Sequence, residues 1–345
     1  MIARRLAYTV LLTALCSLLI ASPGLAADKV KLQGSGASFP FPLYGQWFKT
    51  YSKNHKNVTI DYQAKGSGAG IKDFMNRTVD FAASDAAMTD EDMAAVTAGV
   101  QLLPMTAGEI VLAYNLPKGL KELKLSREVY AKIFLGEITT WNDPMIAAAN
   151  PGETLPDQEI TVVRRADSSG TTYVFTQHLS AISEAWKNGP GTGTTVNWPS
   201  SDKFIAAPKN DGITATIKQT PGSIGYIEYG FAKLTKLPMA SLENKAGKFV
   251  QPSLESGQAA LANVEMPPDL RAWLPDPEGE GAYPIVTYTW MLFYKKYDDP
   301  AKAAAIHDVI EYCLTEGQKI SDKMGYIPLP DNVVQMVSQA AKTIQ

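Results

Sequence analysis

Hydrophobic and polar residues along the first part of the chain follow the spacing of short strands and helices. They alternate at 29–33 and at 58–62, and after each run come glycines and serines and then apolar residues at helical spacing, at 42–51 and 71–75. A third strand-like run at 79–85 ends in an acidic loop before Asp90, Glu91 and Asp92, which suit a helix start. The order strand, loop, helix therefore repeats, as expected of an α/β protein.

The same order occurs once more around the most distinctive loop of the chain, at 164–172. It follows an apolar run at 160–163 and precedes a helical pattern at 173–179. A guanidinium, several hydroxyls and a glycine at the start of a helix form a cradle for an oxyanion, because free N–H groups and the helix dipole favour negative charge there. Asp167 would repel such an anion unless it holds Arg165 in place or accepts a proton from the ligand. The alternative is an ordinary helix cap, with Arg165 paired on the surface.

Four glycine- and serine-containing loops thus follow strands in the same way. In open α/β sheets, ligands bind beyond the carboxyl ends of the strands, so these loops can converge on one crevice. Two apolar segments, at 110–114 and 285–294, read as buried strands that would cross between two lobes if they are adjacent. Between them, the proline- and acid-rich stretch 251–280 reads as a peripheral excursion, and helices are expected at 300–312 and from Asp331.

The N-terminus predicts export from the cytoplasm. Two arginines precede a 15-residue apolar run and small residues, which is typical of a signal peptide over residues 1–26 with cleavage near Ala26 or Ala27. A lipid anchor at Cys16 is disfavoured, because Leu15 is bulkier than the small residue that a lipoprotein signal places there. Cleavage leaves Cys313 alone, as a buried small hydrophobe on a helix.

Charge and motif content exclude several classes of function. The exported chain carries 30 basic and 35 acidic residues, so it has no global field for nucleic acid. Its three histidines are far apart in sequence, and no metal or other cofactor is expected. Neither a phosphate-binding G-x-x-x-x-G-K-[ST] loop, a complete G-x-G-x-x-G nor a nucleophile elbow occurs. A secreted phosphatase, which would need a nucleophile or a metal cluster, remains as an alternative.

Six landmarks together and in this order resemble the phosphate-binding proteins of bacterial phosphate-specific ABC transporters. They are GSGASFP at 34–40, VDFAASD at 79–85, VVRRADSSGT at 162–171, GTGTTVNWP at 191–199, NDG at 210–212 and PGSIGY at 221–226. The resemblance implies an α/β, two-lobed periplasmic binding protein of type II-like fold, each lobe a mixed β-sheet flanked by helices and joined by two hinge strands. Lobe I would span 27–113 plus 286–345 and lobe II 114–285. The monomer would deliver inorganic phosphate to permease subunits in the inner membrane.

The resemblance also implies the ligands of the phosphate. Lobe I would supply the Ser38 hydroxyl, the Phe39 N–H, Ser67 and Asp85, and lobe II would supply Arg165, Asp167, Ser169, Gly170 and Thr171. Three positions depart from the family's usual residues: Ser38 replaces a frequent threonine, Gly68 a second serine, and Ser168 a glycine. Gly68 would leave only a backbone donor at its position.

The physical chemistry agrees with these roles. A buried, doubly charged anion needs donors for every oxygen, and phosphate near neutral pH keeps a proton that an ionised carboxylate can accept. Sulfate has no such proton, so a site built around that hydrogen bond rejects it by about 10⁴ or more. We expect Asp85 to be this acceptor and Asp167 to orient Arg165. The alternatives are that Asp85 caps the following turn, that Ser67 faces solvent, and that the ligand is sulfate, molybdate or a phosphonate.

Overall fold

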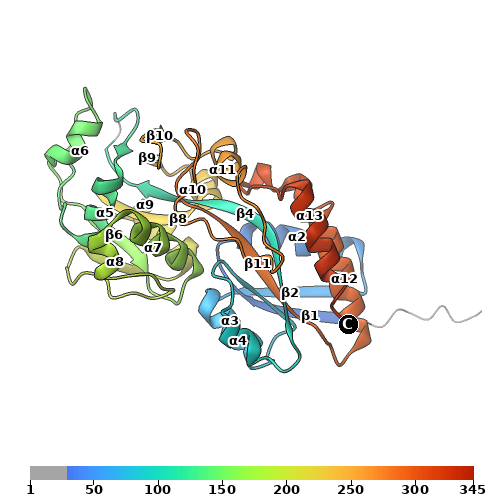
Figure 1. Cartoon of the computed structure of the whole chain (residues 1–345). Coiled ribbons are helices and arrows are strands. Elements are labelled where there is room, and N and C mark those ends of the chain that lie inside the picture. The colour runs from blue at the N-terminus through green and yellow to red at the C-terminus, as the bar shows by residue number, and fades with distance from the viewer. Residues whose placement is uncertain (1–28, 118) are drawn as a thin grey trace, which may run out of the picture.

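The computed structural model describes residues 29–117 and 119–345, so the expected signal peptide and its cleavage site lie outside the described residues. An eight-stranded sheet runs through the molecule in the order β2-β1-β3-β11-β4-β8-β6-β7. Helices cover both faces of the sheet, and the two ends of the sheet form two lobes, as Figure 1 shows.

Lobe I is built on the strands that precede β4 and on β11. Its β1 pairs in parallel with β2 and β3, whereas β11 pairs antiparallel with β3, so the sheet is mixed. The helix α2 packs on one face, where Phe48 contacts Tyr62 and Phe81, and α3 packs on the other, where Asp73 accepts a hydrogen bond from Ser35. Its elements are β1 (Val30–Gly36), α2 (Phe41–Asn54), β2 (Val58–Ala64), α3 (Ser67–Met75), β3 (Phe81–Ser84), α4 (Asp90–Ala94) and the first part of β4 (Val100–Tyr114).

Lobe II is built on β8, β6 and β7, which run parallel to one another, with the second part of β4 antiparallel to β8. Its elements are β5 (Lys124–Leu125), α5 (Arg127–Leu135), α6 (Pro144–Ala149), β6 (Thr161–Arg165), α7 (Gly170–Ile182), α8 (Glu184–Asn188), β7 (Phe204–Ala207), α9 (Lys209–Gln219), β8 (Ser223–Glu228), α10 (Tyr229–Thr235), β9 (Ser241–Glu243), β10 (Phe249–Val250) and α11 (Leu254–Leu261). Strands β10, β9 and β5 form a small separate sheet.

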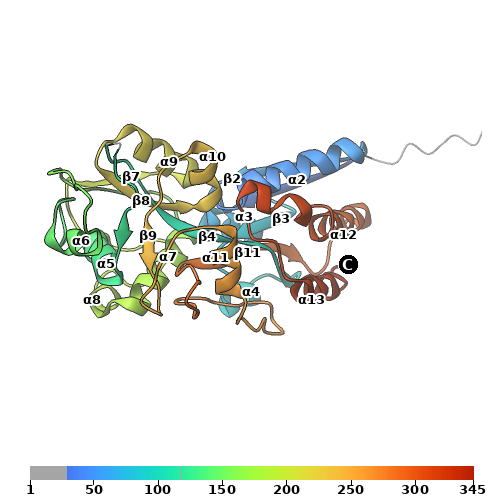
Figure 2. The ribbon, with the colours of Figure 1, turned by 90° about the horizontal axis from the view of Figure 1, so that it is seen from above.

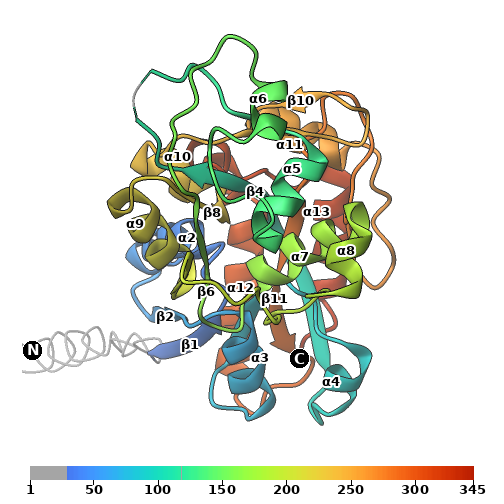
Figure 3. The same ribbon diagram turned by 90° about the vertical axis from the view of Figure 1, so that its left-hand side faces the viewer.

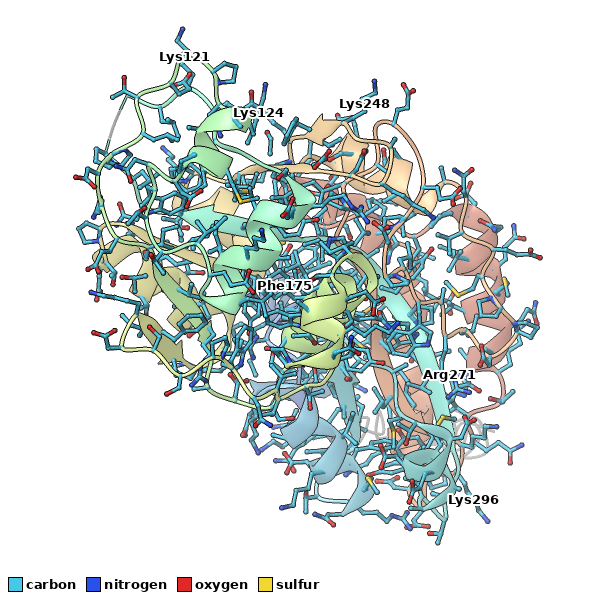
Figure 4. The ribbon with its side chains drawn as sticks, turned by 60° about the vertical axis from the view of Figure 1, so that its left-hand side comes forward. Lys121, Lys124, Phe175, Lys248, Arg271 and Lys296 are labelled. Carbon is cyan, nitrogen blue, oxygen red and sulfur yellow. The ribbon has the colours of Figure 1, made fainter. Side chains whose placement is uncertain are left out.

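The two faces of the lobe II sheet are covered by different helices. Figure 3 shows α9 on one side and α5 and α7 on the other. Tyr226 of β8 packs against Phe175 of α7 and Phe134 of α5, and its neighbour Gly225 faces Ile217 of α9. Figure 4 shows Phe175 within lobe II and Lys121, Lys124 and Lys248 at its outer edge. Burial of each such aromatic side chain stabilises the lobe by about 1.5–3 kcal/mol.

Two long strands connect the lobes. Residues 100–109 of β4 pair with β11 (Val286–Tyr294), and residues 110–114 pair with β8 instead. Figure 2, seen from above, shows β4 and β11 side by side between the lobes. Both apolar segments predicted as crossing strands are buried, but they do not pair with each other. β4 begins ten residues before the predicted segment, and this earlier part, residues 100–109, is the part that pairs with β11.

The chain after β11 returns to lobe I. It forms α12 (Pro300–Leu314), two 3₁₀ turns (Gln318–Ile320 and Asp322–Met324) and α13 (Asp331–Ala341). The predicted apolar face of α12, which includes Cys313, is buried, and Cys313 is a free thiol. None of the helices in the described part of the chain combines the length and apolar character needed to span a bilayer.

The prediction that 251–280 is a peripheral excursion is wrong. Leu270 is buried and its carbonyl accepts a hydrogen bond from the Trp290 indole of β11 at 2.7 Å. Further along, the Pro275 carbonyl lies 2.8 Å from His178 Nδ1 of α7. The segment is as rich in apolar residues as in prolines and acids, and its Trp273 packs against both Tyr173 of lobe II and Trp290 of lobe I.

Candidate functional site

The predicted loops come together where the two lobes touch. The starts of α2 and α3 from lobe I meet the starts of α7 and α9 from lobe II, and four hydrogen bonds cross between the lobes there. Two of them join Asn210 to Ser38, one joins Thr171 to Asp85, and one runs from the Gly68 N–H to the Ser168 carbonyl at 3.1 Å. Converging helix N-termini and loop N–H groups favour an anion.

Glycine is required at two positions of this contact. Gly36 ends β1 with φ of 143°, and a Cβ there would lie 2.0 Å from the Ala83 carbonyl oxygen. Gly170 begins α7, and a Cβ there would lie 2.4 Å from Ser67 Oγ and 2.8 Å from the Asp85 nitrogen. The lobes approach this closely only because position 170 carries no side chain.

Arg165 lies at the end of β6 and is held by Asp167. The guanidinium donates to both carboxylate oxygens, from Nε at 2.8 Å and from Nη2 at 2.5 Å, and its side chain is only 2% exposed. Nη1 is buried and has no hydrogen-bond partner among the described residues. Because a buried cationic N–H is costly to leave unpaired, this group marks a place for an anionic acceptor.

Asp167 stays ionised beside this arginine. Burial alone would raise its pKa, but the hydrogen bonds and charge of Arg165 and the Lys209 N–H hold the pKa below its ordinary value. The alternative of a surface pair is therefore wrong, because Arg165 is buried and Asp167 is half-buried. Asp167 orients the guanidinium, as expected.

Asp85 is fully buried between the lobes and has a different environment. Its Oδ1 accepts from the Thr289 hydroxyl at 2.9 Å and its Oδ2 from the Thr171 hydroxyl at 3.3 Å. Burial raises the pKa of Asp85 to about 7, although Thr289 and the charge of Arg165 act in the opposite direction. Both carboxylate oxygens thus accept from threonines of β11 and α7 rather than from the turn that follows Asp85, and Thr89 caps the next helix.

The remaining predicted residues are also buried in this contact. Ser67 is the first residue of α3, and its hydroxyl accepts the Asp85 N–H at 3.3 Å, so the solvent-facing alternative is wrong. The Phe39 carbonyl accepts a hydrogen bond from the Tyr326 hydroxyl at 2.7 Å. Ser169 caps α7 by accepting the Thr172 N–H at 3.0 Å, so the cap alternative for this loop is correct and coexists with the buried arginine.

The two departures at positions 68 and 168 face each other. A Cβ on Gly68 would lie 2.0 Å from Ser168 Oγ, and the Ser168 hydroxyl donates to Thr194 at 2.9 Å. The space that a side chain at 68 would need is therefore filled by Ser168 from the other lobe. The backbone donor of Gly68 is used across the lobes.

Three site residues were not predicted from the sequence. Asn210 bridges Ser38 and Thr171, Thr289 donates to Asp85, and the Tyr226 hydroxyl accepts the Arg165 N–H at 3.1 Å. Asn210 and Tyr226 stand within landmark stretches, but on a helix and a strand rather than in a loop. Thr289 interrupts an apolar strand, and a polar residue in such a run is the only signal in the sequence.

The histidine and metal predictions concern residues away from this contact. His178 is buried between the Tyr130 hydroxyl and the Pro275 carbonyl, each at 2.8 Å, and burial lowers its pKa to about 4. Within residues 29–117 and 119–345, His, Cys, Asp and Glu side chains nowhere gather in threes as a metal site would require.

Solved structures with a similar fold are phosphate-binding proteins by title. A high affinity periplasmic phosphate-binding protein (PfluDING) bound with phosphate superposes with a TM-score of 0.76 at 21% identity, covering 90% of this chain and 93% of that one. A phosphate-binding protein from Stenotrophomonas maltophilia gives 0.73 at 19% identity, covering 90% and 94%. At these identities the likeness establishes the two-lobed fold.

Phosphate-binding proteins named PstS are more similar to this chain in sequence than these solved structures are. The phosphate-binding protein PstS of Pasteurella multocida is 39% identical over 334 residues, 95% of each chain, and that of Haemophilus influenzae is 38% identical, covering 92% of this chain and 94% of that one. The model of the PBP superfamily domain matches residues 21–316. The chain therefore belongs to the PBP superfamily and, within it, to the family of the phosphate-binding protein PstS.

Proposed function

We propose that this chain captures inorganic phosphate in the periplasm and delivers it to an ABC-type permease, without chemistry of its own. One observation carries the proposal: in the contact between the two lobes, Nη1 of the buried Arg165 has no hydrogen-bond partner within residues 29–117 and 119–345. The names of the PstS relatives and the phosphate-bound structural neighbour support the same ligand.

Hydrogen bonds from both lobes would hold the anion without water. We assign donors to the Ser38 and Ser67 hydroxyls, the Phe39 N–H, Arg165, Ser169 and Gly170, and the backbone N–H of Thr171, whose hydroxyl already donates to Asp85. Asp167 keeps the guanidinium in position. The burial of these groups supports the assignment, since a dianion removed from water requires many charge-assisted hydrogen bonds.

Asp85 would select phosphate over sulfate. Two hydroxyls already donate to its carboxylate, so it acts as an acceptor, and a protonated phosphate oxygen offers it a third donor. Sulfate, molybdate and other fully ionised oxyanions would place a bare oxygen against the carboxylate. The missing hydrogen bond and the repulsion would both weaken their binding.

Closure of the lobes would signal the bound state to the permease. We propose that lobe I comprises 27–113 plus 286–345 and lobe II 114–285, with β4 and β11 as the hinge. The change of partner strand along β4, between Glu109 and Ile110, supports a hinge close to this boundary. A signal peptide over 1–26 would place the monomer in the periplasm.

Isothermal titration of the phosphate-stripped mature protein tests the function. We expect one-to-one binding of phosphate at micromolar or tighter affinity, about −8 kcal/mol or better, and no heat from excess sulfate. Absence of saturable phosphate binding would reject phosphate as the ligand. Sulfate binding of equal strength would reject the role of Asp85.

A further inference from the structure

Asn210 joins the two lobes at the candidate site through a single buried amide. It lies in the first turn of α9 and is fully buried. Its Nδ2 is 3.0 Å from Ser38 Oγ of lobe I and 3.3 Å from Thr171 Oγ1 of lobe II. Its own backbone N–H donates to the same Ser38 oxygen at 3.1 Å.

The orientation of this amide is determined by its other end. The Glu228 backbone N–H donates to Asn210 Oδ1 at 3.0 Å. Because a backbone N–H can only donate, the oxygen of the amide must face it, and the NH₂ group must face the two hydroxyls. Asn210 therefore acts only as a donor toward Ser38 and Thr171.

This donor role determines where the hydroxyl protons point. A hydroxyl has two acceptor lone pairs and one proton. Two N–H groups of Asn210 occupy the acceptor capacity of Ser38 Oγ, so the Ser38 proton is left to donate. Thr171 Oγ1 accepts from Asn210 Nδ2 and directs its proton to Asp85 Oδ2.

The backbone that presents Asn210 is itself unusual. Lys209, which precedes it, has φ of 59° although it is not glycine, a conformation that is uncommon and costly. The result is that two successive N–H groups reach different lobes: that of Lys209 donates to Asp167 Oδ1 at 2.9 Å and that of Asn210 to Ser38. One turn thus contacts the carboxylate that holds Arg165 and the hydroxyl on the opposite lobe.

We propose that Asn210 is a positioning residue that sets the hydrogen-bond polarity of the site. It makes Ser38 a donor to the ligand and makes Thr171 a donor to Asp85, so that the site receives anionic oxygens on one side and a ligand proton on the other. The inference rests on the proposed phosphate-binding function and names a residue that acts through Ser38 and Thr171 rather than on phosphate itself.

A double-mutant cycle with inorganic phosphate as the titrant tests this role. We expect Asn210→Ala to weaken phosphate binding about 10- to 100-fold, because it frees the Ser38 hydroxyl to rotate. In a Ser38→Ala background, the same change should cost several-fold less, since part of its effect passes through the missing hydroxyl. Equal losses in both backgrounds would overturn the proposal.

Two further variants separate positioning from folding. Asn150 is a buried asparagine of lobe II with three hydrogen bonds to the backbone, at Lys124 and Ile146. Asn150→Ala should lower the melting temperature about as much as Asn210→Ala does, but it should leave phosphate affinity unchanged. Asn210→Asp keeps the acceptor for the Glu228 N–H but presents a second acceptor, instead of a donor, to Ser38. It should therefore bind phosphate more weakly than Asn210→Ala. If the alanine variant fails to fold, the affinity of Asn210→Asp still tests the role of Asn210.

The outcomes also separate this inference from the function on which it rests. Wild-type protein that does not bind phosphate would contradict the proposed function. Wild-type protein that binds phosphate, together with an Asn210→Asp variant of unchanged affinity, would contradict only the role of Asn210.

Discussion

Two carboxylates in the same site have opposite properties because their neighbours differ. Asp167 faces a guanidinium and its pKa is lowered despite partial burial, whereas Asp85 faces hydroxyls and its pKa is raised to about 7 by burial. Environment thus separates an orienting carboxylate from one that can share a proton with a ligand.

Asp85→Asn should reduce selectivity more than it reduces affinity. The amide keeps the size of the side chain but can donate to a bare oxygen, so we expect the preference for phosphate over sulfate to fall by about 100-fold or more. Competition of sulfate against phosphate, measured by titration, gives this ratio. Asp73→Asn, on α3 but bonded to Ser35 and Lys65, serves as the control. Unchanged discrimination in Asp85→Asn would contradict the acceptor role.

A second pair of buried carboxylates lies where β4 exchanges β11 for β8. Glu109 and Glu228 are both buried, and each has one carboxylate oxygen without a hydrogen-bond partner among the described residues. Burial raises the pKa of Glu109 to about 8, and burial likewise raises the pKa of Glu228. Near neutral pH Glu109 therefore keeps its proton in the fold.

Glu109→Gln should stabilise the protein at neutral pH and have little effect in acid. The unfolded chain ionises Glu109 above about pH 4.5, whereas the folded chain keeps the proton up to about pH 8. The wild-type free energy of unfolding therefore falls as the pH rises through this range, by roughly 3 kcal/mol at pH 7. Glu109→Gln should avoid this loss, because glutamine does not ionise.

Denaturant unfolding of wild-type and variant protein at pH 4 and pH 7 measures this difference. Glu184→Gln changes a carboxylate whose side chain is 78% exposed and serves as the control. If Glu109→Gln changes the free energy of unfolding by the same amount at both pH values, Glu109 does not keep its proton in the folded protein at pH 7.

At the scale of elements, the contact between the α3 and α7 loops determines how closely the lobes approach. Gly68 and Ser168 share a space that holds one side chain. The hydrogen bond from the Gly68 N–H to the Ser168 carbonyl requires the same close approach.

Gly68→Ser should therefore weaken phosphate binding by hindering closure, by about tenfold or more. Adding Ser168→Gly should restore most of the affinity, since it removes the atoms that a Cβ at 68 would meet. Phosphate titration of the single and double variants measures both effects. Gly45→Ser, at a glycine of α2 with open space around it, should change nothing. Failure of the double variant to recover would show that the pair does not compensate.

Most elements of the first lobe and both hinge strands were predictable from the sequence, but the segment predicted for β4 is ten residues shorter than the strand. Pro104 and Gly108 interrupt its pattern, and a register shift between Thr289 and Trp290 of β11 accommodates the proline. Proline within a sheet is tolerated at such irregularities, so the strand continues where local propensity argues against it.

The site was predictable as far as its loops carry local signals. Arg165, Asp167 and the glycines stand in a pattern that indicates anion binding by itself, and the resemblance added the lobe I residues. Asn210 and Thr289 were missed because their roles arise only when distant elements meet. Neither a helix start nor a threonine in an apolar strand carries that information.

At the scale of the whole molecule, two strands and a set of loop contacts connect the lobes. The β4–β11 ladder extends over nine residues of β11 with one register shift, whereas a few hydrogen bonds join the loops across the candidate site. A ligand that bonds to both sides would add to these contacts and shift the population toward the closed form, because it binds that form better.

Small-angle X-ray scattering of the phosphate-stripped protein tests this central claim most directly. Phosphate should decrease the radius of gyration toward the value for the structure in which the lobes touch, and sulfate at the same concentration should leave the scattering profile of the open protein unchanged. A scattering profile that does not change at saturating phosphate would contradict capture by closure of the two lobes.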